Sequence, residues 1–252
     1  MRRNTSRQTT PKSKTTSYPI RLNRYIANAG ICSRRDADLL IEEGKIKING
    51  KVVTELGVKV EQGDEVRFND KVISLQNFIY LLLNKPKDYI TTMDDPHERK
   101  TVMQLISGAC EERVYPVGRL DRNTTGLLLF TNDGELSQKL THPSYKIKKI
   151  YQVGLDKPLT SNDFKDIAQG FQLEDGHVKV DDIVILDESK KNIGIQIHIG
   201  RNRIVRRIFE HFGYEVVKLD RTMYGNLTKK ELPKGKWRML NEKEVILLKN
   251  LS

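Results

Sequence analysis

An aspartate between two arginines is the residue of this 252-residue chain with the clearest potential for chemistry. Asp121 follows Arg119 and precedes Arg122, in a loop expected between a short strand over 114–117 and a strand over 127–131. Arginine neighbours favour an ionised carboxylate, which a nucleophile requires. Glycines on both sides let a substrate approach the backbone. The spacing allows a nucleophilic carboxylate, but an aspartate between arginines is more often a structural ion pair or a turn cap.

Other chemistries are not indicated by the sequence. The five histidines and two cysteines show no His-x-x-x-His or Cys-x-x-Cys spacing, so a zinc site is not expected. The segment from Gly44 to Val52 has one residue too many between its glycines for a phosphate-binding loop, and it lacks the hydroxyl that would bind Mg²⁺. No Gly-x-Ser-x-Gly motif is present. We therefore expect neither a metal nor a cofactor.

The formal net charge of +11 indicates a polyanionic partner. The excess is concentrated in two places: residues 1–19 carry five basic residues and no acid, and residues 201–238 carry 11 basic and 4 acidic residues. The first segment lacks the apolar residues needed for a core, so a disordered basic tail is expected. No apolar run is long enough for a membrane span, and no signal peptide is recognised.

A small α+β module is expected over about 20–67. Helices over 21–29 and 34–43 are followed by a hairpin of 45–48 and 51–54 around an Asn-Gly turn. Arginines and a serine gather at the start of the second helix, where backbone N–H groups favour an anion, although a solvated face is the alternative. The residues predicted to bind RNA here are Arg21, Arg24, Ser33, Arg34, Arg35 and Lys51.

These residues also carry a resemblance. The pattern Arg-Leu-Asn-Arg-Tyr-Ile-Ala over 21–27, with Gly-Ile-Cys-Ser-Arg-Arg-Asp-Ala over 30–37 and Ile-Asn-Gly over 48–50, resembles the S-four-type RNA-binding domain. The resemblance implies that the start of the second helix and the hairpin form one RNA-binding face.

A second resemblance starts from Val-Gly-Arg-Leu-Asp-Arg-Asn-Thr-Thr-Gly over 117–126. It is similar to the nucleophile motif of the ribosomal group of pseudouridine synthases. Asn-Lys-Pro over 84–86, Lys-Ile-Tyr-Gln-Val over 149–153 and Gly-Arg-Asn-Arg-Ile-Val-Arg-Arg over 200–207 resemble further motifs of that family, in the expected order. Asp88 stands where glycine is frequent in the first of these motifs.

The resemblance implies the isomerisation of uridine in RNA to pseudouridine without a cofactor. Asp121 is then the nucleophile, attacking either C1′ of the ribose or C6 of the base, which the sequence leaves open. Tyr151 would pack against the uracil, and Arg206 would pair with Asp121. Further residues expected to bind RNA in this part of the chain are Lys85, Arg119, Arg122, Arg201, Arg203 and Arg207.

The expected organisation is a tail over 1–19, an RNA-binding domain over 20–68, a linker over 69–77 and a catalytic domain over 78–252. The fold class is α+β, with a mixed, mainly antiparallel sheet in the larger domain. We expect a cytoplasmic monomer that acts on ribosomal RNA. The large subunit is favoured because the run from Arg203 to Tyr214, together with Leu232–Arg238, resembles the large-subunit enzymes of the family. The alternatives are a synthase for small-subunit rRNA or tRNA, and a non-catalytic ribosome-assembly factor.

Overall fold

The computed structural model describes residues 17–251, which form two compact units. Among these residues, unit 1 comprises 17–79 and Cys110–Val114, and unit 2 comprises Tyr80–Ala109 and 115–251. Most of the expected basic tail, residues 1–16, lies outside the described residues. No helix within 17–251 has the length and apolarity needed to span a membrane.

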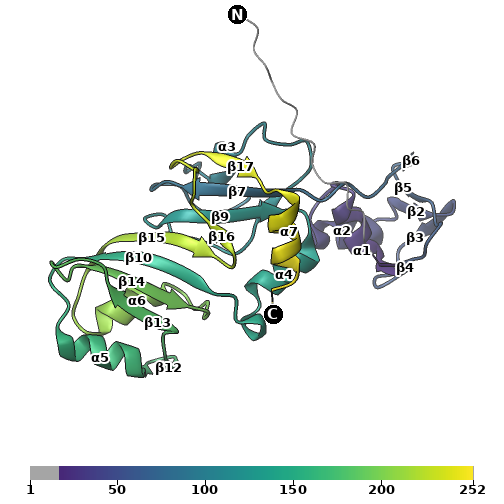
Figure 1. The fold of residues 1–252 in the computed structure, drawn as a ribbon. Coiled ribbons are helices and arrows are strands. Elements are labelled where there is room, and N and C mark those ends of the chain that lie inside the picture. The colour runs from purple at the N-terminus through teal and green to yellow at the C-terminus, as the bar shows by residue number, and fades with distance from the viewer. Residues whose placement is uncertain (1–16, 252) are drawn as a thin grey trace, which may run out of the picture. The chain divides into compact units, whose positions relative to one another are not determined.

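Unit 1 packs two short helices next to a four-stranded sheet of order β3-β2-β5-β6, and a separate pair, β1 with β4, runs antiparallel (Figure 1). Its core is formed by apolar side chains such as Leu22, Ile26, Ile41 and Ile46, all nearly or fully buried. The elements are β1 (Ile20–Arg21), α1 (Leu22–Asn28), α2 (Arg34–Glu42), β2 (Ile46–Ile48), β3 (Lys51–Val53), β4 (Lys59–Val60), β5 (Val66–Phe68) and β6 (Lys71–Val72).

Local sequence signals account for most of unit 1. Ser33 caps α2 by accepting a hydrogen bond from the amide of Asp36, whose carboxylate accepts in return from the Ser33 amide. Asn49 and Gly50 have φ values of 49° and 80°, which is the backbone of a tight two-residue hairpin turn between β2 and β3. The hairpin predicted from the sequence is therefore confirmed, and a capping box fixes the start of α2.

Two local expectations for unit 1 differ from the structure. Arg21 lies in β1 rather than in the first helix, because its backbone pairs with Lys59. The expected linker over 69–77 contains β6, which pairs with β5 across a turn at Asn69 and Asp70. Both turn residues have positive φ, a conformation that Asn and Asp tolerate better than most residues. The Asn-Asp pair is therefore a turn signal in the sequence, and the linker prediction did not take it into account.

Unit 2 is built on one nine-stranded sheet, with α5 and α6 beside one end of it and α4 beside α7 near the β9 strand (Figure 1). Its elements are β7 (Tyr80–Lys85), α3 (Val102–Leu105), β8 (Tyr115–Pro116), β9 (Thr125–Thr131), α4 (Gly134–Thr141), a 3-10 turn (Pro143–Tyr145), β10 (Lys149–Leu155), α5 (Ser161–Gln169), β11 (Phe171–Leu173), β12 (Gly176–Val178), β13 (Asp182–Ile185), β14 (Asn192–Ile197), α6 (Ile204–His211), β15 (Val216–Tyr224), β16 (Leu227–Thr228), β17 (Trp237–Met239) and α7 (Glu242–Lys249).

The sheet follows the order β13-β14-β10-β15-β9-β7-β17, with β8 and β16 added beside β9 and β15. All of its pairings are antiparallel except that of β15 with β9. The predicted α+β class with a mixed, mainly antiparallel sheet is confirmed. Every residue of β7 and β9 is buried, which fits the continuous apolar runs Leu81–Leu83 and Leu127–Phe130 of strands covered on both faces.

The parallel pair depends on a glycine. Gly126 lies opposite Arg221, with a φ of 109°, and a Cβ added to it would lie 2.2 Å from the Arg221 carbonyl oxygen and 2.5 Å from the Arg221 nitrogen. We expect Gly126→Ala to lower the free energy of unfolding by about 3 kcal/mol, because backbone strain adds to a clash with backbone atoms that cannot move aside. Urea denaturation measures this loss.

Gly108→Ala is the matched control for that substitution. Gly108 also has a positive φ, 74°, but nothing lies within 4 Å of an added Cβ. This variant isolates the conformational cost, which we expect to be about 1 kcal/mol. Equal losses in the two variants would mean that the close approach of β9 and β15 does not limit the size of residue 126.

Candidate active site

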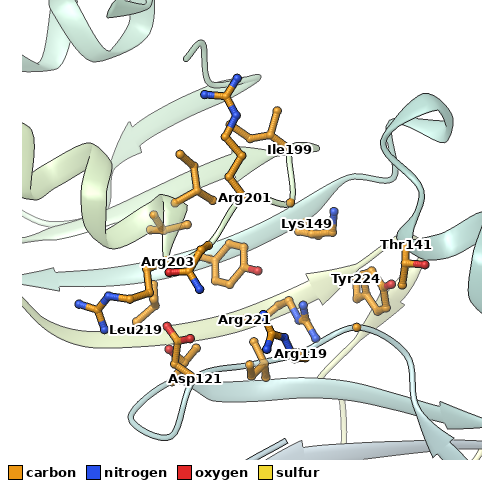
Figure 2. A pocket seen from close by; sticks show the side chains of 18 of the residues that line it. Arg119, Asp121, Thr141, Lys149, Ile199, Arg201, Arg203, Leu219, Arg221 and Tyr224 are labelled. Atoms are coloured by element: carbon orange, nitrogen blue, oxygen red, sulfur yellow. The ribbon is translucent and has the colours of Figure 1, made fainter. Parts of the chain in front are cut away.

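A pocket of about 280 Å³ opens in unit 2 beside the sheet. It is lined by the loop that leads into β9, by the facing strands β10 and β15, and by the segment that leads into α6. Figure 2 shows Asp121 and Arg119 on one side of the pocket, Arg221 and Tyr224 along β15, and Lys149 on β10. Leu140 and Thr141 at the end of α4 also line it, so the pocket collects residues from five separate parts of the sequence.

Asp121 is the acidic residue among those that line this pocket. Its loop is closed by a hydrogen bond of 3.0 Å from the Thr124 amide to the Asp121 carbonyl. Arg119 lines the pocket with it, whereas Arg122 turns to Asp88, with Nε at 3.4 Å from Oδ1. The predicted arrangement of one carboxylate held between two arginines is therefore only half realised.

The segment that follows β7 holds the Asp121 loop in place through hydrogen bonds. The Asp88 amide donates to the Arg122 carbonyl at 3.0 Å, and Thr91 Oγ1 donates to the Leu120 carbonyl at 2.8 Å. Asp88 adopts a φ of 71°, which explains on physical grounds why glycine suits that position. The loop on both sides of Asp121 is thus fixed by hydrogen bonds.

Lys85 is the strongest of these restraints. Its side chain is completely buried, and Nζ donates to the carbonyls of Pro86, Asp121, Arg122 and Thr124 at 2.8–3.3 Å. Burial lowers its pKa to about 8, and the nearby Asp121 charge opposes that shift. The prediction that Lys85 binds RNA is wrong: the side chain points into the interior and serves the Asp121 loop instead.

Tyr151 lines the pocket from the middle of the sheet. It lies on β10, opposite Ile195 of β14 and Arg221 of β15, and is 8% exposed. Strands on both sides therefore fix the backbone of the residue that is expected to pack against a uracil.

Arg206 lies on α6 and is not among the residues that line the pocket. It is 9% exposed, and one terminal nitrogen donates to the Val216 carbonyl at 2.7 Å while Nε has no partner. Burial lowers its pKa, Arg203 lowers it further, and Asp121 raises it. Among the described residues no ion pair joins Arg206 to Asp121, so the expected pairing is a longer-range attraction in this structure.

Sequence reasoning missed two cations of the pocket, Lys149 and Arg221. Arg221 is 3% exposed, donates through Nε to the Leu127 carbonyl at 2.8 Å, and lies over the Tyr224 ring at 4.7 Å. Lys149 precedes Tyr151 by two residues, so both side chains belong to the same face of β10. Lys149 could have been found from that spacing, but no sequence signal marked Arg221.

The remaining basic residues predicted around the pocket are engaged with acids. Arg207 holds Asp175 through two hydrogen bonds of 2.7 and 2.8 Å, and Arg201 approaches the same carboxylate at 3.4 Å. Arg203 donates to Glu210 at 3.2 Å. Arg201 and Arg203 also line the pocket, whereas Arg207 does not. Their binding of RNA stays a prediction.

Most of the residues of unit 1 that are predicted to bind RNA are exposed on its surface. Arg21, Arg34, Arg35 and Lys51 are exposed, and Arg24 is half-buried. The Ser33 hydroxyl is occupied, since it donates to the Asp36 carboxylate at 2.8 Å. The start of α2 therefore carries its own negative group where an external anion was expected.

The pocket as a whole places a single carboxylate among several cations. Within 17–251 no cluster of three or more histidine, cysteine or acidic side chains is arranged to hold a metal ion. An anionic substrate is attracted by the cations, and a positioned carboxylate can attack an electrophilic carbon of that substrate.

Comparison with known proteins agrees with this geometry. The family of RNA pseudouridylate synthases matches residues 79–211, and the S4 domain matches residues 20–66. A solved structure described as a pseudouridylate synthase superposes with a TM-score of 0.66 at 32% identity, over 91% of this chain and 99% of that one.

Relatives align along nearly the whole chain. The "Ribosomal large subunit pseudouridine synthase B" of Bacillus subtilis (strain 168) is 42% identical over 92% of this chain and 96% of its own length. The "Dual-specificity RNA pseudouridine synthase RluF" of Escherichia coli (strain K12) is 37% identical over 90% of this chain and 77% of its own length. Both resemblances seen in the sequence are confirmed, and the chain belongs to the RNA pseudouridylate synthase family and carries an S4 domain.

Proposed function

We propose that this protein converts a uridine of large-subunit ribosomal RNA into pseudouridine, with Asp121 as the nucleophile. The observation that carries the proposal is the Asp121 carboxylate in a pocket whose other charged lining residues are cations. The 42% identical relative of Bacillus subtilis is named for the large ribosomal subunit, which supports that target. We expect the protein to act as a cytoplasmic monomer.

The reaction needs no external reactant. The N1–C1′ bond of the target uridine breaks, the uracil turns, C5 bonds to C1′, and the proton that leaves C5 is balanced by one that N1 gains. A carboxylate nucleophile divides this exchange into two easier steps, through attack on either C1′ or C6. Tyr151 packs against the uracil, and Arg206 attracts the Asp121 carboxylate from behind.

The target base has to leave its stack to enter the pocket, which costs a few kcal/mol. Contacts to the RNA backbone offset that cost. In unit 1 the exposed Arg34, Arg35 and Lys51 are suited to phosphates, and in unit 2 Arg119 stands at the pocket itself.

Mapping pseudouridine in rRNA from cells with and without the gene tests the proposal. We expect one or a few sites of large-subunit rRNA to lose the modification and to regain it when the wild-type gene is returned. Loss confined to small-subunit rRNA or to tRNA would overturn the assigned target. Unchanged pseudouridine in all three RNAs, with RNA binding intact, would favour a ribosome-assembly factor.

A further inference from the structure

Two cations of the pocket have no acidic partner. Lys149 Nζ donates to the His198 carbonyl at 2.9 Å, and Arg221 Nε donates to the Leu127 carbonyl. Neither of them forms an ion pair with a carboxylate within residues 17–251. Two acids near them are already used: Asp181, whose charge acts on Lys149, contacts His198, and Asp220, which precedes Arg221, contacts Thr125 and Lys229.

The sheet brings these two cations next to Tyr151. Lys149 and Tyr151 are two residues apart on β10 and share a face, and Tyr151 lies directly opposite Arg221 on β15. All three side chains line the pocket. In Figure 2, Lys149 and Arg221 come from neighbouring strands, and Arg221 lies close to Arg119 of the loop that carries Asp121.

Arg221 is held in a fixed pose but is incompletely satisfied. It is 3% exposed, its guanidinium lies over the Tyr224 ring, and its second terminal nitrogen, Nη2, is buried without a hydrogen-bond partner. A buried donor without an acceptor is costly, and a buried unpaired charge is more so. An anionic acceptor from the substrate would satisfy both this donor and its charge.

Lys149 has one acceptor, the His198 carbonyl, but it too lacks an acidic partner. Burial lowers its pKa to about 8, the positive charge of Arg221 lowers it further, and Asp181 opposes both effects. The two cations therefore repel each other across the pocket. An anion bound between them would relieve the repulsion and supply acceptors to both.

An RNA substrate brings such an anion with every nucleotide. The planar fork of an arginine fits two oxygens of a phosphate group, and an ammonium adds a charge from a second direction. Uracil itself is neutral at pH 7 and matches two cations less well than a phosphate does. We propose that Lys149 and Arg221 bind a phosphate group of the target nucleotide itself and thereby hold its ribose beside Asp121. This inference rests on the proposed function, because it takes a uridine in RNA as the substrate.

Titration of the protein with one nucleoside and two nucleotides, followed by NMR, tests the phosphate site without any turnover. The ligands are uridine, uridine 5′-monophosphate and uridine 3′-monophosphate. We expect one monophosphate to bind wild-type protein about tenfold more tightly than uridine, as charge-assisted hydrogen bonds would provide. In Lys149→Met that preference should fall to about twofold or less, while the affinity for uridine stays unchanged.

Lys148→Met is the matched control, since Lys148 is the exposed neighbour of Lys149 and does not line the pocket. It should keep the full preference for the monophosphate. Arg221→Gln tests the second cation, with thermal unfolding recorded beside it because Arg221 also bonds to β9. If Arg221→Gln fails to fold, Lys149→Met alone still tests whether the pocket cations bind the phosphate group.

Two results would overturn the phosphate site. One is equal affinity of wild-type protein for uridine and for both monophosphates. The other is an undiminished preference in Lys149→Met, which would assign the phosphate to other cations of the pocket. Because the titration requires no product, it remains informative if wild-type protein fails to make pseudouridine, and the two proposals can therefore fail separately.

Discussion

Asp121→Asn is expected to abolish pseudouridine formation while RNA binding and folding remain intact. An amide fills the same space and keeps the loop hydrogen bonds, which go to the main chain of residue 121 rather than to its carboxylate. It cannot act as the nucleophile, so the rate should fall by at least about a thousandfold, the scale typical of losing a group that forms a covalent intermediate. Single-turnover assays on RNA that contains the mapped uridine measure the rate, and filter binding measures the affinity.

Asp88→Asn is the control for Asp121→Asn. Asp88 carries a carboxylate that is 63% exposed, and it contacts Arg122 of the same loop. Removing this charge should change the rate by no more than about twofold, since exposed ion pairs contribute little. Conversion at the parental rate by Asp121→Asn would exclude Asp121 as the nucleophile, whatever the family suggests.

Local signals in the sequence were sufficient for much of the fold. The Ser33–Asp36 capping box, the Asn49-Gly50 turn and the apolar runs of β7 and β9 each depend on a few adjacent residues. The second turn, at Asn69 and Asp70, is of the same kind, but its flanking strands are so short that the segment resembled a linker.

The pocket was harder to predict, because side-chain direction depends on the sheet order. Lys85 follows an asparagine and precedes a proline, which is typical of an exposed turn, yet β7 is central and its last side chain points inward. Arg221 reaches the pocket only because β15 lies between β9 and β10. Arg207 is paired with Asp175, which lies 32 residues away on the chain and carries no motif. These contacts are set by long-range pairing, which spacing along the chain does not reveal.

The distribution of charge also shows that the pocket depends on contacts that the sequence alone does not reveal. A net charge of +11 indicates a polyanion but does not identify a site. In the structure, Arg201, Arg203 and Arg207 near the pocket are paired with acids, whereas the half-buried Lys149 and the buried Arg221 are not. Binding specificity is therefore expected from these two pocket cations more than from the surface excess.

Lys85→Met is expected to damage both stability and activity. It leaves three main-chain carbonyls of the Asp121 loop, those of Asp121, Arg122 and Thr124, without the donor that they share. Unsatisfied buried carbonyls cost about 1–3 kcal/mol each, and removal of the buried ammonium offsets part of that cost. We expect the free energy of unfolding to fall by about 3 kcal/mol and kcat to fall by at least tenfold, with less effect on KM, because the loop that carries Asp121 loses its support.

Lys87→Met provides the comparison, because Lys87 is exposed and lies two residues further along the same motif. If Lys85 acted by binding RNA, Lys85→Met would weaken RNA affinity and leave stability and kcat largely unchanged, as in Lys87→Met. If Lys85 supports the loop, only Lys85→Met should lose stability and kcat. Unchanged unfolding in Lys85→Met would contradict the role assigned to the four hydrogen bonds.

The pH dependence separates the charge of Lys85 from its bulk. Burial lowers the Lys85 pKa to about 8 in the folded protein, below the value of about 10.4 for an exposed lysine in the unfolded chain. Between these values the unfolded chain binds the proton more tightly, so this group adds stability as the pH rises from about 8 to about 10.4. Wild-type protein should therefore gain stability relative to Lys85→Met over that range. Its activity should decline at the same time, because a neutral amine has two N–H donors for four carbonyls.

Parallel urea titrations of wild-type protein and Lys85→Met at pH 7 and pH 9.5 measure the difference in unfolding free energy between them. We expect this difference to be larger at pH 9.5. A difference that is smaller at pH 9.5 would show that Lys85 binds its proton more tightly in the folded protein than in the unfolded chain.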